Sequence, residues 1–343
     1  MSTSAPTAPS TAASLGGRRQ SPLQRVQHLL HAHPALSPAL ILVLTFLVFS
    51  LMNGRFASAA SLSLMIQQTA VIACLAVGQT LIILTAGIDL SVGAIAILST
   101  MFSATIAFEN GVPGLLAVMI GIAVGTLCGA LNGFLVTRVN LPPFIVTLGT
   151  LSIFTAIALL YSGGQSIQGG DLPAFLNFTG NTISIGGFTV TYGVIIVALV
   201  YLAVGFALSQ TAWGRHVYAV GDDAEAARLS GIAAKRVLLS VYAAAGFIYG
   251  IGAWVLIGRA GAATPNAITD ANLESITAVV IGGTSLFGGR GGVLGTLLGA
   301  LIVQSFTTGL SLAGVDQQYR LLAVGVLVIV AVSVDQWIRK VKA

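Results

Sequence analysis

Charged side chains are scarce in this sequence, and their scarcity excludes most classes of soluble protein. Asp, Glu, Lys and Arg together make up 7% of the 343 residues, against about 25% in an average soluble domain. Hydrophobic residues make up 56% and the mean hydropathy is +0.95, so too few charged side chains remain to cover a water-facing surface. The solvent for most of the chain is therefore lipid. A receptor with one membrane anchor and a large soluble domain is excluded.

Short alternating segments edged by aromatic residues, which are typical of outer-membrane barrels, are missing, and aromatic residues make up only 7%. Continuous apolar runs are present instead, and inside lipid a helix satisfies the backbone of such a run. Because a span takes about 20 apolar residues, the sequence predicts an all-α polytopic membrane protein with about ten transmembrane helices. The apolar runs lie near 38–53, 62–85, 91–108, 113–136, 143–161, 189–208, 238–258, 274–287, 292–312 and 320–337.

Motifs for nucleotide hydrolysis and catalysis are absent. The sequence has no GxxxxGK(S/T) phosphate loop, no HExxH and no GxSxG, which are the motifs of P-loop ATPases, zinc proteases and serine hydrolases. Cys74 and Cys128 lie inside apolar runs without a CxxC motif, so we expect buried thiols rather than a metal site. We therefore expect a transport protein rather than an enzyme, with no metal and no cofactor bound by this chain.

The basic residues are few, and their distribution indicates an orientation. The chain has 15 Lys and Arg against 10 Asp and Glu, a small excess that requires no nucleic acid as a partner. Ten spans place both termini on one side of the membrane. Only Arg55, Arg259 and Arg320 then fall on the other side, which leaves 12 of the 15 on the side of the termini. Since cytoplasmic loops carry the excess of Lys and Arg, we expect both termini in the cytoplasm.

The first 34 residues hold no acidic residue and are rich in Ser, Thr, Ala, Pro and Arg. This composition predicts a disordered cytoplasmic tail, although an Arg- and Ser-rich, acid-poor start is also typical of organelle transit peptides. Residues 35–343 are expected to form a single transmembrane domain with two long loops. The external segment near 162–188 either docks an external partner or only connects two helices.

The second long loop, near 209–237, is cytoplasmic and contains a short predicted helix. Asp223 is placed to cap its N-terminus, Glu225 suits its first turn, and Gly231 is placed to end it after about two turns. On these residues alone, the helix is either an ordinary amphipathic connector or a contact for a cytoplasmic partner.

Two glycine-containing segments interrupt the apolar runs. TAGIDLSVG (85–93) puts Asp89 between two runs, where an acid either caps a helix or marks a transport path. GGTSLFGG (282–289) is weakly similar to this segment. Interrupted helices in internal repeats are common around the binding sites of transporters. We therefore predict broken or re-entrant segments near 85–93 and 283–292.

Glycines also recur at intervals of four residues, a spacing that lets helices approach closely. We expect these glycines to pack helices together rather than to contact a solute. They are Gly121, Gly125, Gly129 and Gly133; Gly246 and Gly250; and Gly291, Gly295 and Gly299.

Four segments together resemble the membrane permease of bacterial ABC-type monosaccharide importers, in the ribose, xylose and fructose branch. They are LTAGIDLSVGAI (84–95), NGFLVTRVNLPPFIVTLGT (132–150), GxxVYAVGxxxEAARLSGI (214–232) and VVIGGTSLFGGRGG (279–292). The resemblance covers the chain beyond the tail. It implies a homodimer in the bacterial inner membrane, two cytoplasmic ATPase subunits that bind ATP and Mg, a periplasmic sugar-binding protein and a monosaccharide substrate.

The resemblance also implies roles for particular residues. It makes 222–232 the coupling helix that sits in a groove of the ATPase, and the family usually has Asn where this chain has Asp223. The implied coupling residues are Asp222, Asp223, Glu225, Ala226, Arg228, Leu229 and Gly231. The solute path is implied to pass near the two breaks, where an uncharged sugar needs hydroxyl and aromatic contacts. The path candidates are Asp89, Ser91, Phe144, Thr147, Tyr249, Thr284 and Ser285, together with Thr85.

An ion-coupled secondary transporter of a small polar solute is the alternative, because such transporters also use many helices and broken segments. That mechanism needs acidic or His relays within the membrane, and only Asp89 and Glu274 are available for it. Among importer substrates, we expect ribose, fructose or xylose, with autoinducer-2 or a polyol as further alternatives.

Overall fold

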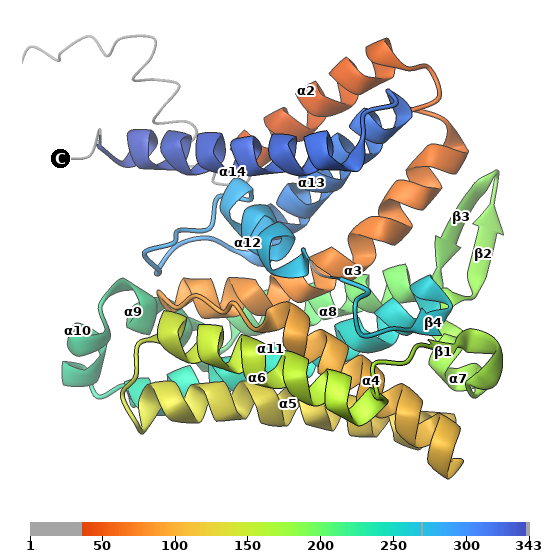
Figure 1. Ribbon diagram of the computed structural model, residues 1–343. Helices are drawn as coiled ribbons and strands as arrows, with labels where there is room; N and C mark the ends of the chain where they lie inside the picture. Colours follow the sequence, from red (N-terminus) through yellow and green to blue (C-terminus); the bar gives the residue numbers. More distant parts are fainter. Residues whose placement is uncertain (1–35, 269, 341–343) are drawn as a thin grey trace, which may run out of the picture.

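A computed structural model describes residues 36–268 and 270–340 and shows a bundle of antiparallel helices (Figure 1). The predicted tail, residues 1–34, lies outside the described residues. Within them, seven helices are long and apolar enough to cross a membrane. They are α3 (Ala59–Leu84), α4 (Val92–Asn110), α5 (Gly114–Thr137), α6 (Pro143–Ser162), α8 (Tyr192–Gln210), α11 (Ala234–Ala260) and α13 (Val293–Leu312).

Three further helices, α2 (Leu36–Met52), α12 (Ala271–Ile281) and α14 (Gln317–Lys340), contain shorter apolar stretches. Each of the ten predicted apolar runs therefore coincides with a helix, and the all-α membrane fold is confirmed. The run expected near 274–287 is helical only as far as Ile281. Its 11 residues rise about 16 Å, about half the thickness of the hydrocarbon core, so α12 is a half-helix rather than a tenth full span.

Both predicted breaks are present. The chain is non-helical between Leu84 and Val92 and again between Ile281 and Val293. In the second break, Gly283, Gly288, Gly289 and Gly291 have positive φ angles between 71° and 127°, a region that favours glycine because it has no Cβ. The glycines of this segment therefore end α12 at Ile281, whereas the hydrophobic pattern alone predicts that the helix continues to residue 287.

The predicted glycine packing is confirmed at the centre of the bundle, where α11 crosses α5. A Cβ atom on Gly125 would lie 2.6 Å from the carbonyl oxygen of Gly246, and one on Gly129 would collide with the carbonyl oxygen of Tyr242. Such close approach of two backbones is the usual role of small residues in membrane helices. The half-helix α12 meets α13 in the same way, because a Cβ on Gly299 would collide with the carbonyl oxygen of Ala278.

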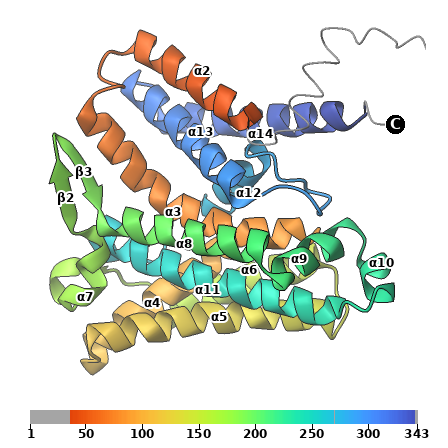
Figure 2. The ribbon, with the colours of Figure 1, turned by 180° about the vertical axis from the view of Figure 1, so that it is seen from behind.

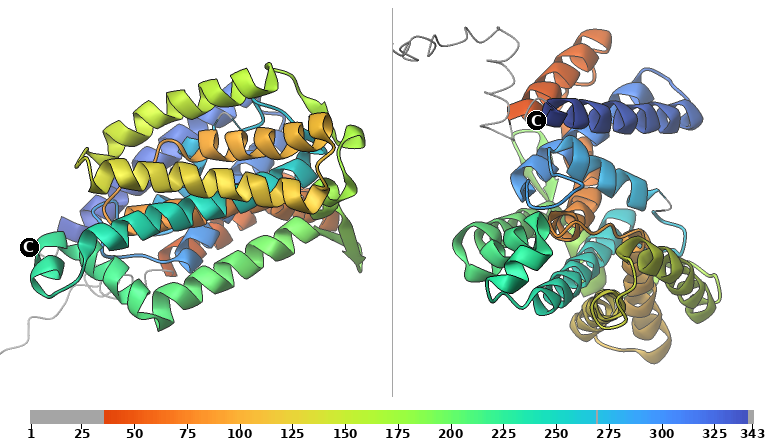
Figure 3. Two further views of the ribbon diagram at one scale, coloured as in Figure 1. Left: turned by 90° about the horizontal axis from the view of Figure 1, so that it is seen from below. Right: turned by 90° about the vertical axis from the view of Figure 1, so that its left-hand side faces the viewer.

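Small non-membrane elements lie at the two ends of the bundle, as Figures 1 and 3 show. One end carries α9 (Ala212–Asp222) and α10 (Ala224–Leu229). The opposite end carries the loop predicted near 162–188, which is ordered. This loop contains β1 (Ile167–Gln168), η1 (Gly169–Asp171), α7 (Ala174–Asn177), η2 (Phe178–Gly180), β2 (Thr182–Ile185) and β3 (Phe188–Thr191). β1 pairs with β4 (Ala262–Ala263), and β2 pairs with β3 in an antiparallel hairpin.

Candidate functional site

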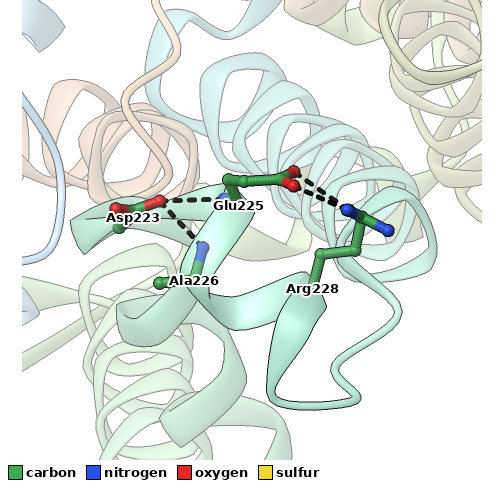
Figure 4. Close-up of polar contacts among 4 residues, drawn as sticks. All are labelled: Asp223, Glu225, Ala226 and Arg228. Carbon is green, nitrogen blue, oxygen red and sulfur yellow. Dashed lines mark hydrogen bonds and ion pairs between the residues drawn. The ribbon is translucent and has the colours of Figure 1, made fainter.

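The short helix predicted in the loop near 209–237 is α10, and Asp223 caps it as predicted (Figure 4). Its Oδ1 atom accepts hydrogen bonds of 2.9 Å from the backbone amides of Glu225 and Ala226. The helix ends before Gly231, whose φ of 88° lets the chain turn away. Because this cap and stop use only local contacts, the residues predicted from the sequence are those that form the helix.

The outer surface of α10 is exposed, and it combines a charged pair with an apolar side chain. Arg228 donates two hydrogen bonds to Glu225, from Nε to Oε2 at 2.9 Å and from Nη2 to Oε1 at 2.6 Å. These bonds hold the pKa of the Glu225 carboxyl below its usual range. Leu229 is 74% exposed beside them, whereas Ala227 is buried and anchors the helix. All seven predicted coupling residues are exposed, either on α10 or directly before and after it.

The loss of the Asp223 cap is expected to loosen α10 without unfolding the bundle. Replacing a capping Asp by Ala costs about 0.5–2 kcal/mol, so Asp223→Ala should speed hydrogen exchange at the amides of residues 225–230. Asp223→Asn retains an acceptor oxygen and should exchange as the wild type does. Equal protection in Asp223→Ala and the wild type would show that contacts other than the cap hold this helix.

The helix α9, which leads directly into α10, rests on both breaks through residues that sequence reasoning had not singled out. The amide of Gly289 donates a 3.0 Å hydrogen bond to the carbonyl of Leu84, which joins the two breaks directly. Gly221, at the end of α9, packs against this pair so closely that a Cβ would collide with the Leu84 carbonyl. The hydroxyl of Tyr218 on α9 donates a 2.9 Å hydrogen bond to the carbonyl of Gly291. The exposed helix α10 is thus linked through α9 to both interruptions of the membrane helices.

The first break is held by a buried polar network around Asp89. Its Oδ1 atom accepts hydrogen bonds from the backbone amide of Ser91 at 2.7 Å and from the Ser91 hydroxyl at 2.6 Å. Asn132 on α5 donates a 2.9 Å bond to the same hydroxyl, and Asn272 on α12 accepts a 2.7 Å bond from the amide of Gly93. Asp89 is fully buried and fixes the start of α4. Neither asparagine was predicted, because their partners lie 41 and 179 residues away in the sequence.

The path candidates fall into three places. Asp89, Ser91 and Thr147 belong to the first break, since Thr147 on α6 donates a 3.1 Å hydrogen bond to the carbonyl of Ile88. Tyr249 on α11 lies beside this group and is fully buried.

The other three candidates lie elsewhere. Thr284 and Ser285 are buried in the second break, and Phe144 is 50% exposed near the start of α6. A cavity of about 330 Å³ opens next to the first break and is lined by Thr85, Gly87 and Tyr242 together with residues 140–143. Thr85 is buried as well, so in this conformation seven of the eight candidates are enclosed by the bundle and Phe144 is the exception.

Comparisons with known proteins identify the family. Residues 61–332 match the family described as "Branched-chain amino acid transport system / permease component". The fructose import permease protein of Rhizobium meliloti is 49% identical over 335 residues, which are 96% of this chain and 93% of that protein. The ribose import permease protein of Bacillus subtilis is 36% identical over 301 residues, covering 88% of this chain and 92% of that protein.

The D-allose transport system permease protein of Escherichia coli is also 36% identical over 301 residues, covering 88% of this chain and 91% of that protein. No solved structure matches. The family match covers most of the chain, and the relatives match along nearly their whole lengths, so the resemblance drawn from the four segments is confirmed. The chain belongs to the permease family of ABC-type monosaccharide importers.

Proposed function

We propose that this chain forms the membrane path of an ATP-driven importer that brings a monosaccharide into a bacterial cell. Two copies assemble in the inner membrane with both termini in the cytoplasm. Two cytoplasmic ATPase subunits bind ATP and Mg, whereas this chain binds no cofactor, and a periplasmic protein delivers the sugar. Fructose is the first candidate substrate, because the relative named for fructose import is 49% identical and those named for ribose and allose are 36% identical.

The observation that carries this proposal is the position of α10, which is exposed on its outer face and follows directly on α9, the helix that contacts both breaks. A short capped helix with an exposed Leu229 suits a groove on a partner, since an isolated apolar side chain on a charged helix gains by being buried. When the ATPases close, they pull α10, and the contact of Gly221 with Leu84 and Gly289 carries this movement to the breaks. The ATPases can drive transport only if their contacts with two conformational states of the permease differ in free energy.

The alternative of an ion-coupled transporter gains no support from the relatives, which are named as import permeases for sugars. The structure also gives Asp89 a local role, because its Oδ1 atom holds the amide and hydroxyl of Ser91. This bonding gives Asp89 a part in holding the start of α4.

A charge reversal on α10 is expected to abolish uptake while the permease stays folded. Glu225→Lys with Arg228→Glu keeps two opposite charges three residues apart, so the internal pair can re-form, but it inverts the pattern presented to the ATPase. Like charges placed opposite each other at an interface cost several kcal/mol. We expect ATP-dependent uptake of labelled sugar into vesicles to fall at least tenfold.

The same vesicles, containing the permease, its ATPase and its binding protein, identify the substrate when labelled fructose, ribose and xylose are compared. The melting temperature of the reversed variant serves as the control for folding. Uptake that follows an imposed proton or sodium gradient without the ATPase would contradict the proposal. A reversed variant that transports at the wild-type rate would remove α10 from the coupling mechanism.

A further inference from the structure

The second break contains a tight loop, residues 285–290, which points to the end of the bundle that carries α9 and α10 (Figures 1 and 2). Two backbone hydrogen bonds close it, from the amide of Ser285 to the carbonyl of Arg290 at 2.9 Å and from the amide of Gly288 to the carbonyl of Ser285 at 3.0 Å. The hydroxyl of Ser285 accepts a third bond, of 3.2 Å, from the amide of Phe287. Because its shape is fixed in advance, a partner that binds this loop loses little conformational entropy.

One side of the 285–290 loop packs against the end of α9. A Cβ on Gly288 would lie 2.5 Å from the carbonyl oxygen of Gly221, and a Cβ on Gly289 would lie 2.9 Å from the Cα of Asp222. Asp222 is the last residue of α9 and directly precedes Asp223, the residue that caps α10. The loop therefore lies beside the point at which α10 begins, with no long side chain between the two backbones.

Two other residues of the loop are exposed. Phe287 is 65% exposed, and Arg290 is exposed as well. Among the side chains that the structure describes, Arg228 and Glu225 form the one ion pair, so none of the described carboxylates neutralises Arg290. The loop thus presents an aromatic ring and a cationic side chain, and both kinds of residue are enriched where proteins contact each other.

The small size of α10 indicates that a protein bound to it contacts more of this end of the bundle. The helix has six residues, and even the whole segment 222–232 falls short of the about 20–30 residues a side that a stable interface uses. A partner that holds α10 firmly enough to move it therefore covers neighbouring surface too. The 285–290 loop is such a surface, because Gly289 packs against Asp222 at the start of this segment.

We propose that the 285–290 loop is a second contact for the ATPase subunit, bound at the same time as α10. This inference rests on the proposed function, which supplies the partner. Arg290 meets an acidic side chain of the ATPase, and Phe287 packs beside it. Because the loop connects α12 to α13, the ATPase acts on the second break directly, in addition to the route through α9.

Photo-crosslinking in vesicles that contain the full permease and its ATPase tests this contact. The photoreactive amino acid p-benzoylphenylalanine replaces Leu229 on α10, Phe287 in the loop, or Ile185 on the β2–β3 hairpin at the opposite end of the bundle. All three side chains are exposed. We expect crosslinks to the ATPase from the first two positions and none from the third.

The crosslinks also separate this inference from the proposed function. If the probe at Leu229 reaches the ATPase and the probe at Phe287 reaches only lipid or a second copy of the permease, the loop is not a contact and the role of α10 stands. If neither probe reaches the ATPase, the proposed function fails together with the inference.

A matched pair of charge reversals tests the contribution of Arg290. Arg290→Glu and Arg138→Glu change the net charge equally, and both arginines are exposed. The segment that follows Arg138 lies at the same end of the bundle, since Asn140 accepts a 2.8 Å hydrogen bond from Lys235 near the start of α11. We expect Arg290→Glu to raise the Kd between ATPase and permease by about tenfold or more, and Arg290→Lys and Arg138→Glu to bind as the wild type does.

The Kd is measured by titrating the purified ATPase onto the full permease in lipid nanodiscs, and the melting temperature of each variant serves as the control for folding. Equal weakening by Arg290→Glu and Arg138→Glu would show a general effect of charge at this end of the bundle and would overturn the proposal. Wild-type binding by a folded Arg290→Glu variant would overturn it as well.

Discussion

Replacing Gly221 by valine is expected to reduce ATP-driven sugar uptake at least tenfold while the chain still inserts into the membrane. A Cβ on Gly221 would collide with the carbonyl of Leu84 and would lie 2.7 Å from the amide nitrogen of Gly289. Both are backbone atoms, so no side chain can move aside. Overpacking costs about 1–3 kcal/mol even where side chains can adjust. The valine therefore separates the end of α9, which carries α10, from the two breaks that it has to move.

The measurement compares Gly221→Ala, Gly221→Val and Gly149→Val in vesicles with the ATPase and binding protein. Gly149 has no atom within 4 Å of the position of a Cβ, so its variant controls for the added side chain. We expect intermediate uptake for the alanine variant and continued ATP hydrolysis without uptake for the valine variant. Wild-type uptake by a folded Gly221→Val protein would show that this contact does not transmit the movement.

The close contact at Gly221 suits transmission because it joins three backbone segments with no flexible side chain between them. A long side chain can change rotamer and absorb a small displacement, whereas backbone atoms in contact move together. Tyr218 adds a second link, through its hydrogen bond to the carbonyl of Gly291. A displacement of α10 by its partner therefore passes to α9 and from there to Leu84 at the end of α3 and Gly291 before α13.

Local sequence signals predicted much of this structure. The ten apolar runs match ten helices because the apolar side chains of each helix either pack in the bundle or face lipid, and both positions need a continuous apolar run. The cap at Asp223 was predictable because its partners are two and three residues away. The spacing of Gly125 and Gly129 predicted close packing, although it did not identify α11 as the partner.

Contacts between segments that lie far apart in the chain could not be predicted from the sequence. Nothing near Asn132 or Asn272 shows that these side chains hold the start of α4, because each contact depends on how the helices are arranged. The hydroxyl of Thr147 marked it as a path candidate, but the folded chain pairs it with the carbonyl of Ile88. The short length of α12 depends on backbone angles at glycines that a hydropathy pattern does not register.

Valine at Gly129 is expected to cause a large loss of stability. A Cβ there would collide with the carbonyl of Tyr242 and would lie 2.9 Å from the Cα of Gly246, so α5 and α11 must separate along their contact. Tyr242 would move with α11, and its hydroxyl lies next to Gly87, 3.1 Å from the position of a Cβ on that glycine. The damage therefore extends from the helix pair to the first break.

The loss is measured as the melting temperature of the purified permease. A cost of about 3 kcal/mol lowers the midpoint by several degrees, because each kcal/mol shifts it by about 2–4 °C in chains of 150–250 residues and by less in a longer chain. Gly149→Val adds the same side chain to α6, where nothing lies within 4 Å, and should melt with the wild type. If Gly129→Val and Gly149→Val melt at the same temperature, the backbone contact between α5 and α11 is not what holds these helices together, and the close approach at Gly246 would have to be a consequence of packing elsewhere in the bundle.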